Sequence, residues 1–146
     1  MNRFLIALLP LLLAFGMGVA GCSRGDDWKT LNDEAMSLYQ QGQYDRALVV
    51  AKKALEVAEK AVGPNHPDVA TSLNNLGLLY DTQGQYAQAE PLFKRSLATR
   101  EKALGPDHPD VAESLENLAS LYRKTNRVKE AEALEKRAAA IRAMKR

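Results

Sequence analysis

The sequence has little of the chemistry on which most enzymes and disulfide-bonded proteins depend. Its 146 residues include one cysteine, Cys22, so no internal disulfide can form. Neither sign of charge dominates, because 20 Lys and Arg residues stand against 18 Asp and Glu residues, and we therefore expect no nucleic-acid surface. The length suffices for one ordinary domain and not for two.

Catalytic and metal-binding patterns are also missing. Gly63, Gly84 and Gly105 each fall in a turn and not in a phosphate-binding loop. The two histidines, His66 and His108, each recur with a loop and lack further ligands at the spacing of a metal site. We interpret them as loop residues that hydrogen-bond nearby backbone. The sequence predicts no enzyme, no cofactor and no metal site.

A long apolar run is found at the N-terminus. Residues 1–21 have a basic start, an apolar stretch from Phe4 to Phe15 and small residues before Cys22, which is the pattern of an export signal. The run is short for a membrane span, and Pro10 interrupts it. Residues 22–27 are polar, lack an apolar period and are predicted to form a tether.

The segment Val19-Ala20-Gly21-Cys22 resembles the cleavage box of bacterial lipoproteins. That resemblance implies removal of residues 1–21 and attachment of fatty acyl chains to Cys22, which would hold the protein at a membrane. Ser23 follows the cysteine in place of the aspartate that marks inner-membrane retention, so the resemblance favours the outer membrane, facing the periplasm. The alternative is an uncleaved anchor, or an ordinary signal with an incidental cysteine.

The remainder of the chain is built on a repeat. The segment from Gly63 to Ala70 returns as the segment from Gly105 to Ala112, an offset of 42 residues. The same offset relates apolar positions outside this loop, among them Leu31, Leu73 and Leu115, and Ala47, Ala89 and Ala131. Units of this length are too small to bury their own apolar faces and stack into one elongated core.

Each unit is predicted to be a hairpin of two amphipathic helices. In the first unit, Leu31, Ala35 and Leu38 recur at helical spacing, and Gly42 then breaks the pattern. Asp68 and Asp110 stand where later helices begin, and we expect their carboxylates to cap free N–H groups. The predicted fold is an all-α, right-handed α-solenoid of about three hairpins over residues 28–146. Its repeats are placed at about 28–69, 70–111 and 112–146.

The second unit resembles the tetratricopeptide repeat. Leu76-Gly77-x2-Tyr80, followed by Ala89-x3-Phe93, matches that repeat's pattern. The offset of 42 residues and the recurring Gly63 loop are similar to the kinesin-light-chain type of repeat, over roughly Trp28 to Arg142. Glu135 stands where Phe93 stands in the second unit, so we expect the last helix to be half exposed, as in a terminal cap.

This resemblance implies a protein-binding groove lined by the first helix of each hairpin. An asparagine that often hydrogen-bonds the main chain of a bound peptide in the family falls on Asn75 and Asn117, and Asp33 takes its place in the first unit. The neighbours expected on the same face are Asn32, Met36, Thr71, Asn74, Leu78, Ser120 and Lys124. In the alternative, both asparagines are solvated or serve packing between repeats.

The leading hypothesis is a lipid-anchored adaptor of the bacterial envelope that presents its groove to an extended or helical segment of a protein partner. A structural alternative is a self-assembling subunit whose ends, near Trp28 or Ile141, bury against another copy or a larger complex. A pilotin-like helper of an envelope complex is a special case of that alternative.

Overall fold

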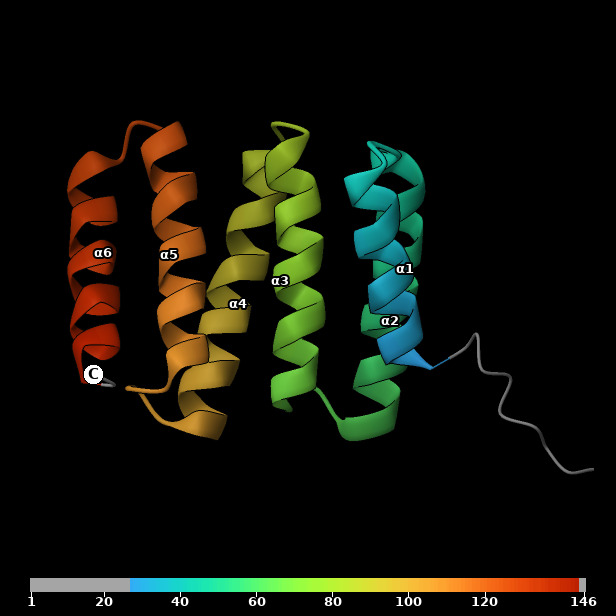
Figure 1. Ribbon diagram of the computed structural model, residues 1–146, viewed down its shortest axis with the longest axis horizontal. Coiled ribbons are helices and arrows are strands. Elements are labelled where there is room, and N and C mark those ends of the chain that lie inside the picture. Colours follow the sequence, from blue (N-terminus) through green and yellow to red (C-terminus); the bar gives the residue numbers. More distant parts are fainter. Residues whose placement is uncertain (1–26, 145–146) are drawn as a thin grey trace, which may run out of the picture.

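The computed structural model describes residues 27–144, which form six α-helices and no strand. The helices are α1 (Trp28–Gln40), α2 (Tyr44–Val62), α3 (Pro67–Thr82), α4 (Tyr86–Leu104), α5 (Pro109–Lys124) and α6 (Val128–Ala143). Consecutive helices pair as antiparallel hairpins that stand in a row (Figure 1). The predicted all-α solenoid of three hairpins is confirmed.

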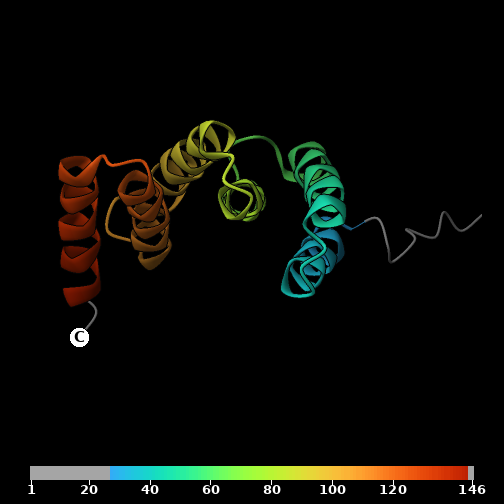
Figure 2. The same ribbon diagram turned by 90° about the horizontal axis from the view of Figure 1, so that it is seen from above.

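The row of hairpins is curved. Viewed from above, α1 and α3 lie on the inner side of the curve, α2 and α4 lie on the outer side, and α6 forms the far end of the row (Figure 2). None of the helices within residues 27–144 combines the length and the apolar character that crossing a membrane requires. The curvature gives the described part of the chain a concave face on the side of the first helices.

The turn inside each hairpin depends on a residue with a left-handed backbone. Gly42 and Gly84 take this conformation in the first two hairpins, with φ of 74° and 72°. Asn126 takes it in the third, with φ of 61°. Besides glycine, asparagine is among the residues that adopt this region most readily, so all three turns have the same shape with different residues.

The loops between hairpins are capped by histidine and not by the expected aspartate. Nδ1 of His66 accepts a hydrogen bond from the N–H of Asp68 at 3.2 Å, and Nδ1 of His108 accepts one from Asp110 at 3.1 Å. A proline follows each histidine at the first helical position, where its missing N–H costs nothing. The prediction that Asp68 and Asp110 are the caps is therefore wrong by two residues. The interpretation of the histidines as loop residues that bond nearby backbone is confirmed.

The hydrophobic core runs along the row and joins each hairpin to the next. Leu76 and Leu79 of α3 lie in one buried cluster with four side chains of the first hairpin, namely Ala35, Leu38, Ala47 and Ala51. In the next cluster, Phe93 of α4 packs with Leu118 and Leu121 of α5. Neither hairpin could bury these side chains alone, so the stack is the folding unit.

Gly77 provides the space for the largest fully buried side chain in the described chain, Phe93. A Cβ atom built on Gly77 would lie 2.7 Å from Cε1 of the Phe93 ring, which is closer than real contacts allow. The two helices of the second hairpin therefore approach closely only because residue 77 has no side chain.

We predict that Gly77→Ala lowers the free energy of unfolding, although alanine favours the helix by about 1 kcal/mol. Overpacking a closed core costs about 1–3 kcal/mol, so we expect a net loss of about 1 kcal/mol. Urea unfolding followed by circular dichroism measures it. Combining Gly77→Ala with Phe93→Leu should cost less than the sum of the two single changes, and a strictly additive result would contradict the contact.

The concave face as candidate binding site

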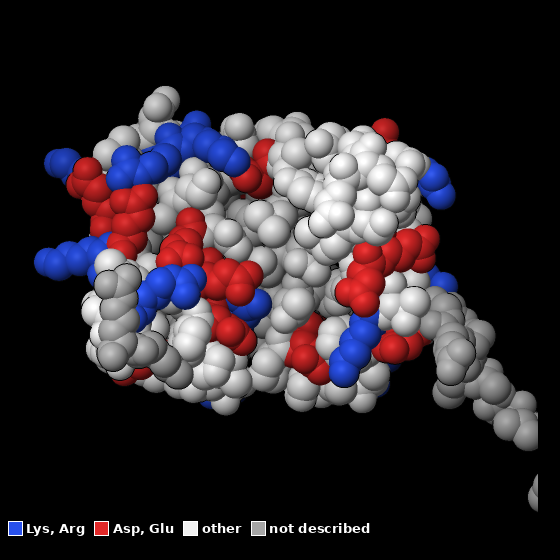
Figure 3. Space-filling model, in the orientation of Figure 1, with Lys and Arg blue, Asp and Glu red and all other residues white. Residues whose placement is uncertain are grey.

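The concave face is hollowed over α3 and has no charge at its middle. Figure 3 shows this face with an uncharged centre and with Lys, Arg, Asp and Glu gathered on either side. Thr71, Asn75 and Leu78 of α3 are partly exposed and follow one another at spacings of four and three residues. That spacing places them along one side of the helix. The middle of the face thus offers a polar and apolar surface without charge.

The predicted groove asparagines bond one another between hairpins. Nδ2 of Asn75 donates to Oδ1 of Asn32 at 3.4 Å, and Nδ2 of Asn117 donates to Oδ1 of Asn74 at 2.8 Å. Both bonds join residues that are 43 apart in the sequence, so they repeat from one junction to the next. We call these two bonds the asparagine ladder.

The two asparagines of each pair differ in burial and in the hydrogen bonds that they make. Asn32 and Asn74 are only 6% and 2% exposed, and their amide nitrogens donate to Ser72 and Glu113. Their amide groups are therefore used in packing between hairpins. Asn75 and Asn117 are partly exposed, and within residues 27–144 no hydrogen bond reaches either Oδ1. Each keeps an acceptor and one N–H for another molecule.

The other predicted groove residues divide by exposure. Met36 and Leu78 occupy equivalent places on α1 and α3 and are partly buried, whereas the equivalent Ser120 on α5 is exposed. Asp33 is exposed at the first hairpin. Thr71 is partly buried, and its hydroxyl donates to the carbonyl of Pro67 at 3.4 Å. The face therefore changes from apolar side chains on the first two hairpins to polar ones on the third.

Asp81 is a residue that sequence reasoning missed. Its Oδ2 is 2.5 Å from Nζ of Lys124, one of the predicted groove residues, while its Oδ1 is buried and has no hydrogen-bond partner among the described residues. The sequence carries no repeated signal for it, since Tyr39 and Arg123 stand at the equivalent places of the other hairpins. The Lys124 ammonium group is thus held toward α3 at one end of the concave face.

A network of charges joins the second and third hairpins beside this end. Glu90 of α4 is 2.7 Å from Nζ of Lys94 and 2.8 Å from Nη1 of Arg127, and the Tyr122 hydroxyl donates to it at 3.2 Å. The hydrogen bonds from Lys94 and Arg127 lower the pKa of Glu90 from 4.5 to about 2. Arg127 also stacks on the Tyr122 ring at 3.8 Å.

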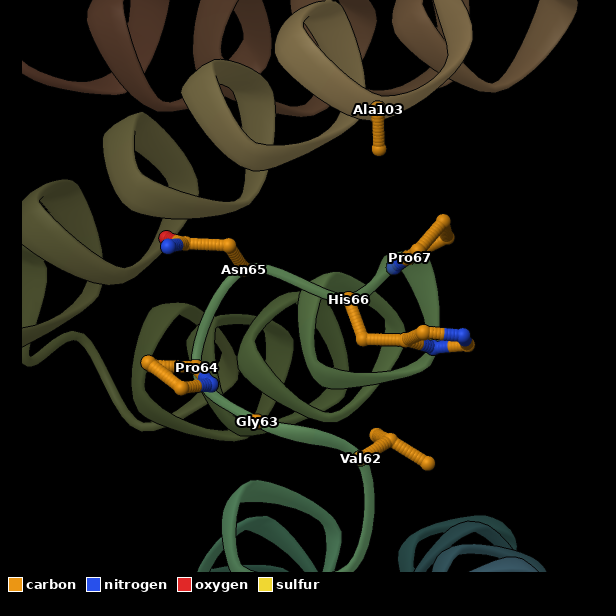
Figure 4. Close-up of a pocket in the computed structure, with 7 residues that line it drawn as sticks. All are labelled: Val62, Gly63, Pro64, Asn65, His66, Pro67 and Ala103. Atoms are coloured by element: carbon orange, nitrogen blue, oxygen red, sulfur yellow. The ribbon is translucent and has the colours of Figure 1, made fainter.

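A separate shallow depression of about 450 Å³ lies at the connection between α2 and α3. Residues 62–67 and Ala103 of α4 line it, and Figure 4 shows Ala103 facing this loop from the neighbouring helix. The lining is mainly apolar, and the His66 nitrogen Nδ1 is already used as a helix cap. The depression lies at the ends of the helices and contains none of the predicted groove residues. In the described part of the chain, no three His, Cys, Asp or Glu side chains could hold a metal ion.

Comparison with known proteins agrees with the stack of helical hairpins. The family model of the tetratricopeptide repeat matches residues 29–102 and 82–144. The crystal structure of BtubC (BKLC) from P. vanneervenii is similar with a TM-score of 0.75 and 31% identity, over 80% of this chain and 47% of that one. A kinesin-light-chain-like protein of Podosopora anserina with nearly identical repeats has a TM-score of 0.72 and 27% identity, over 79% and 55%.

A third solved structure is similar in fold alone. The tetratricopeptide domain of Arabidopsis FLU has a TM-score of 0.68 at 18% identity, over 77% of this chain and 92% of that domain. The chain spans about half the length of the BtubC and Podosopora anserina proteins. The comparisons therefore concern the stack of helices and not those whole proteins.

We predict that Glu90→Gln lowers stability at neutral pH and has no effect in strong acid. The pKa of Glu90 is lower in the folded state, so its contribution is complete above the unfolded pKa of 4.5 and is lost as pH falls toward about 2. Because the carboxylate is partly exposed, we expect a loss of about 1 kcal/mol at pH 7.

Urea unfolding of both chains at pH 7 and near pH 2 measures this difference. Glu56→Gln is the matched control, because Glu56 forms an exposed pair with Lys60 within one helix and should change stability little. An equal destabilisation by Glu90→Gln at both pH values would contradict the charge network.

Proposed function

The chain belongs to the tetratricopeptide repeat family, whose stacks are scaffolds for protein–protein interaction, and we propose that it presents its concave face to an extended segment of a protein partner. The observation that carries the proposal is the unsatisfied hydrogen-bonding capacity of Asn75 and Asn117 on that face. A side-chain amide can bond both the N–H and the C=O of a passing main chain, whatever its sequence.

The asparagine ladder supports this proposal. Each of the two amides is fixed by one N–H to the preceding hairpin, so its orientation is set before a partner arrives. Binding therefore costs less side-chain entropy than it would with freely rotating groups. Oδ1 and the second N–H of each amide stay available for the main chain of the partner.

Apolar contact would supply the second part of the binding. Met36 and Leu78 are partly exposed at equivalent positions on α1 and α3, and the middle of the face lacks charge. A partner segment with apolar side chains over α1 and α3 would remove Met36 and Leu78 from water. Tetratricopeptide proteins are typically not enzymes, and we infer that this chain acts by holding its partner in place.

We further propose that the scaffold is held at a membrane through acyl chains on Cys22, at the outer membrane of a bacterial envelope and facing the periplasm. Cys22 and the leader lie outside the described residues, and the support comes from the lipoprotein-like segment Val19-Ala20-Gly21-Cys22. The tether would be short, because α1 begins at Trp28. Fixing the stack close to the membrane would limit its partners to those of the same compartment.

We predict that a photo-crosslinking residue placed at Leu78 captures the partner in producing cells, whereas the same residue at Val49 does not. Leu78 faces the concave side, and Val49 is a residue of α2 that is 70% exposed. Adducts identified by mass spectrometry give the result. Adducts formed at Val49 and absent at Leu78 would show that the partner binds the outer face, which would contradict the proposal.

We also predict that Asn75→Ala combined with Asn117→Ala lowers the yield of the Leu78 adduct several-fold. The matched control is Asn32→Ala with Asn74→Ala, which breaks the same two ladder bonds but leaves the exposed asparagines in the groove. Far-UV circular dichroism checks the fold of both. If the control pair loses the adduct equally, the asparagines serve packing and not recognition.

For the anchor, we predict that a radiolabelled fatty acid is incorporated into the wild-type chain and not into Cys22→Ser. The serine variant lacks the only thiol, so it has no group to which the thioether-linked acyl chains could be attached. Cys22→Ala is a second variant without a thiol. Label retained by both variants would exclude acylation at this position.

A further inference from the structure

Three sets of contacts recur at each junction between hairpins. The first is the asparagine ladder. The second also joins α1 to α3 and α3 to α5, through residues that are 43 apart in the sequence. It consists of the pairs Thr82–Tyr39 at 3.3 Å and Lys124–Asp81 at 2.5 Å. The third joins second helices at residues 36 apart and consists of the pairs Arg95–Glu59 and Arg137–Glu101. Each hairpin thus presents three polar groups to the next one.

The third hairpin has different residues at these three places. At the offset of 42 residues, Glu116 stands where Asn74 stands, Arg123 where Asp81 stands, and Ala143 where Glu101 stands. Ala143 cannot form an ion pair. None of the three residues that bond a following hairpin is therefore kept at the outward edge of the stack.

The two charged residues at this edge are instead bound within their own hairpin. Nε and Nη2 of Arg142 donate to the two carboxylate oxygens of Glu116 at 2.7 and 2.8 Å. Nε and Nη2 of Arg123 donate to Glu135 at 2.6 Å each. Such bidentate pairs are strong, and they tie α5 to α6 across the edge that a fourth hairpin would cover. Burying them would require removing both from water.

The first hairpin shows the complementary change on its own outward edge. Leu76 and Leu79 pack α3 on the first hairpin, and Leu118 and Leu121 do the same for α5 on the second. At the offset of 42 residues, α1 has Glu34 and Ser37, and both are exposed. A preceding hairpin would bury a carboxylate where the other junctions bury a leucine, which is unfavourable without a partner.

We infer that both ends of the stack are closed against continuation, so that neither a second copy of this chain nor another repeat protein adds to it end to end. The structure therefore assigns partner binding to the long faces of the stack, and it opposes a self-assembling subunit that joins through its ends.

The inference is tested by rebuilding the first junction between two separate molecules. A variant open at the C-terminal end copies the outward edge of the first hairpin through Glu116→Asn, Arg123→Tyr, Glu135→Ala and Ala143→Glu. A variant open at the N-terminal end copies the inward edge of the second hairpin through Asp33→Asn, Glu34→Leu, Ser37→Leu and Gln40→Thr.

Full-length chains in a non-ionic detergent are compared by analytical ultracentrifugation, with circular dichroism melts to confirm that each is folded. We expect the wild type and each variant alone to have the mass of one chain, and an equimolar mixture of the two variants to have twice that mass. Each variant alone is the control for the other, because end-to-end pairing needs one open edge of each kind.

Two results would overturn the inference. One is a mixture of folded variants that stays at the mass of one chain. The other is a wild-type oligomer that Ser37→Arg or Ala143→Arg dissociates, since that would show an end already open. If a fourfold variant does not fold, the single changes Ser37→Leu and Arg123→Tyr repeat the mixing test, with pairing expected at higher concentration and its absence counting against the inference.

Discussion

The structure depends on the burial of leucines between hairpins. Leu76 and Leu79 leave water only because the first hairpin is present, and Leu118 and Leu121 need the second in the same way. A helical hairpin in isolation would leave one such face exposed, so the hydrophobic contribution to stability comes from the junctions. The polar contacts at each junction are individually weak and set the register with which the leucines meet. The asparagine ladder belongs to this second group and is costly to disturb, because Asn32 and Asn74 are buried.

The asparagine ladder joins stability to binding. Asn32 and Asn74 are buried and need partners, because an unpaired amide in the core is destabilising. Asn75 and Asn117 satisfy them and are themselves held at the edge of the concave face. The packing of the stack therefore orients the groups that we propose for recognition. Substitution of the exposed asparagine removes the packing bond and the recognition group, whereas substitution of the buried one removes the packing bond and leaves the recognition group in place but less firmly oriented.

The fold could be predicted from the sequence because the pattern of one helical hairpin recurs in all three repeats. The repeated leucines and alanines, the left-handed glycines and the loop prolines each appear at a fixed offset, and periodic evidence of this kind identifies stacked hairpins. The prediction that Asp68 caps its helix was wrong. Asp68 and His66 can both accept a hydrogen bond, and only the path of the loop decides which one reaches an N–H. The hydrogen bond between Asn75 and Asn32 could not be predicted from the sequence either. It follows from how two inner helices lie side by side, and the offset of 42 residues by itself does not bring residues 43 apart into contact.

Closed ends and a main-chain-binding groove together restrict how the proposed partner is selected. The asparagines would bond any extended main chain, so they add affinity and orientation without selecting a sequence. Growth of the stack, by which other repeat proteins lengthen their binding surfaces, is blocked at both edges by Glu34 and by the Arg142–Glu116 pair. Selectivity must then come from the few side chains that differ along the three inner helices. Met36 and Leu78 favour apolar groups toward the N-terminal end, while Ser120 and the Lys124–Asp81 ion pair favour polar groups toward the other. A partner segment that is apolar at one end and polar at the other would therefore be favoured in one direction over the reverse.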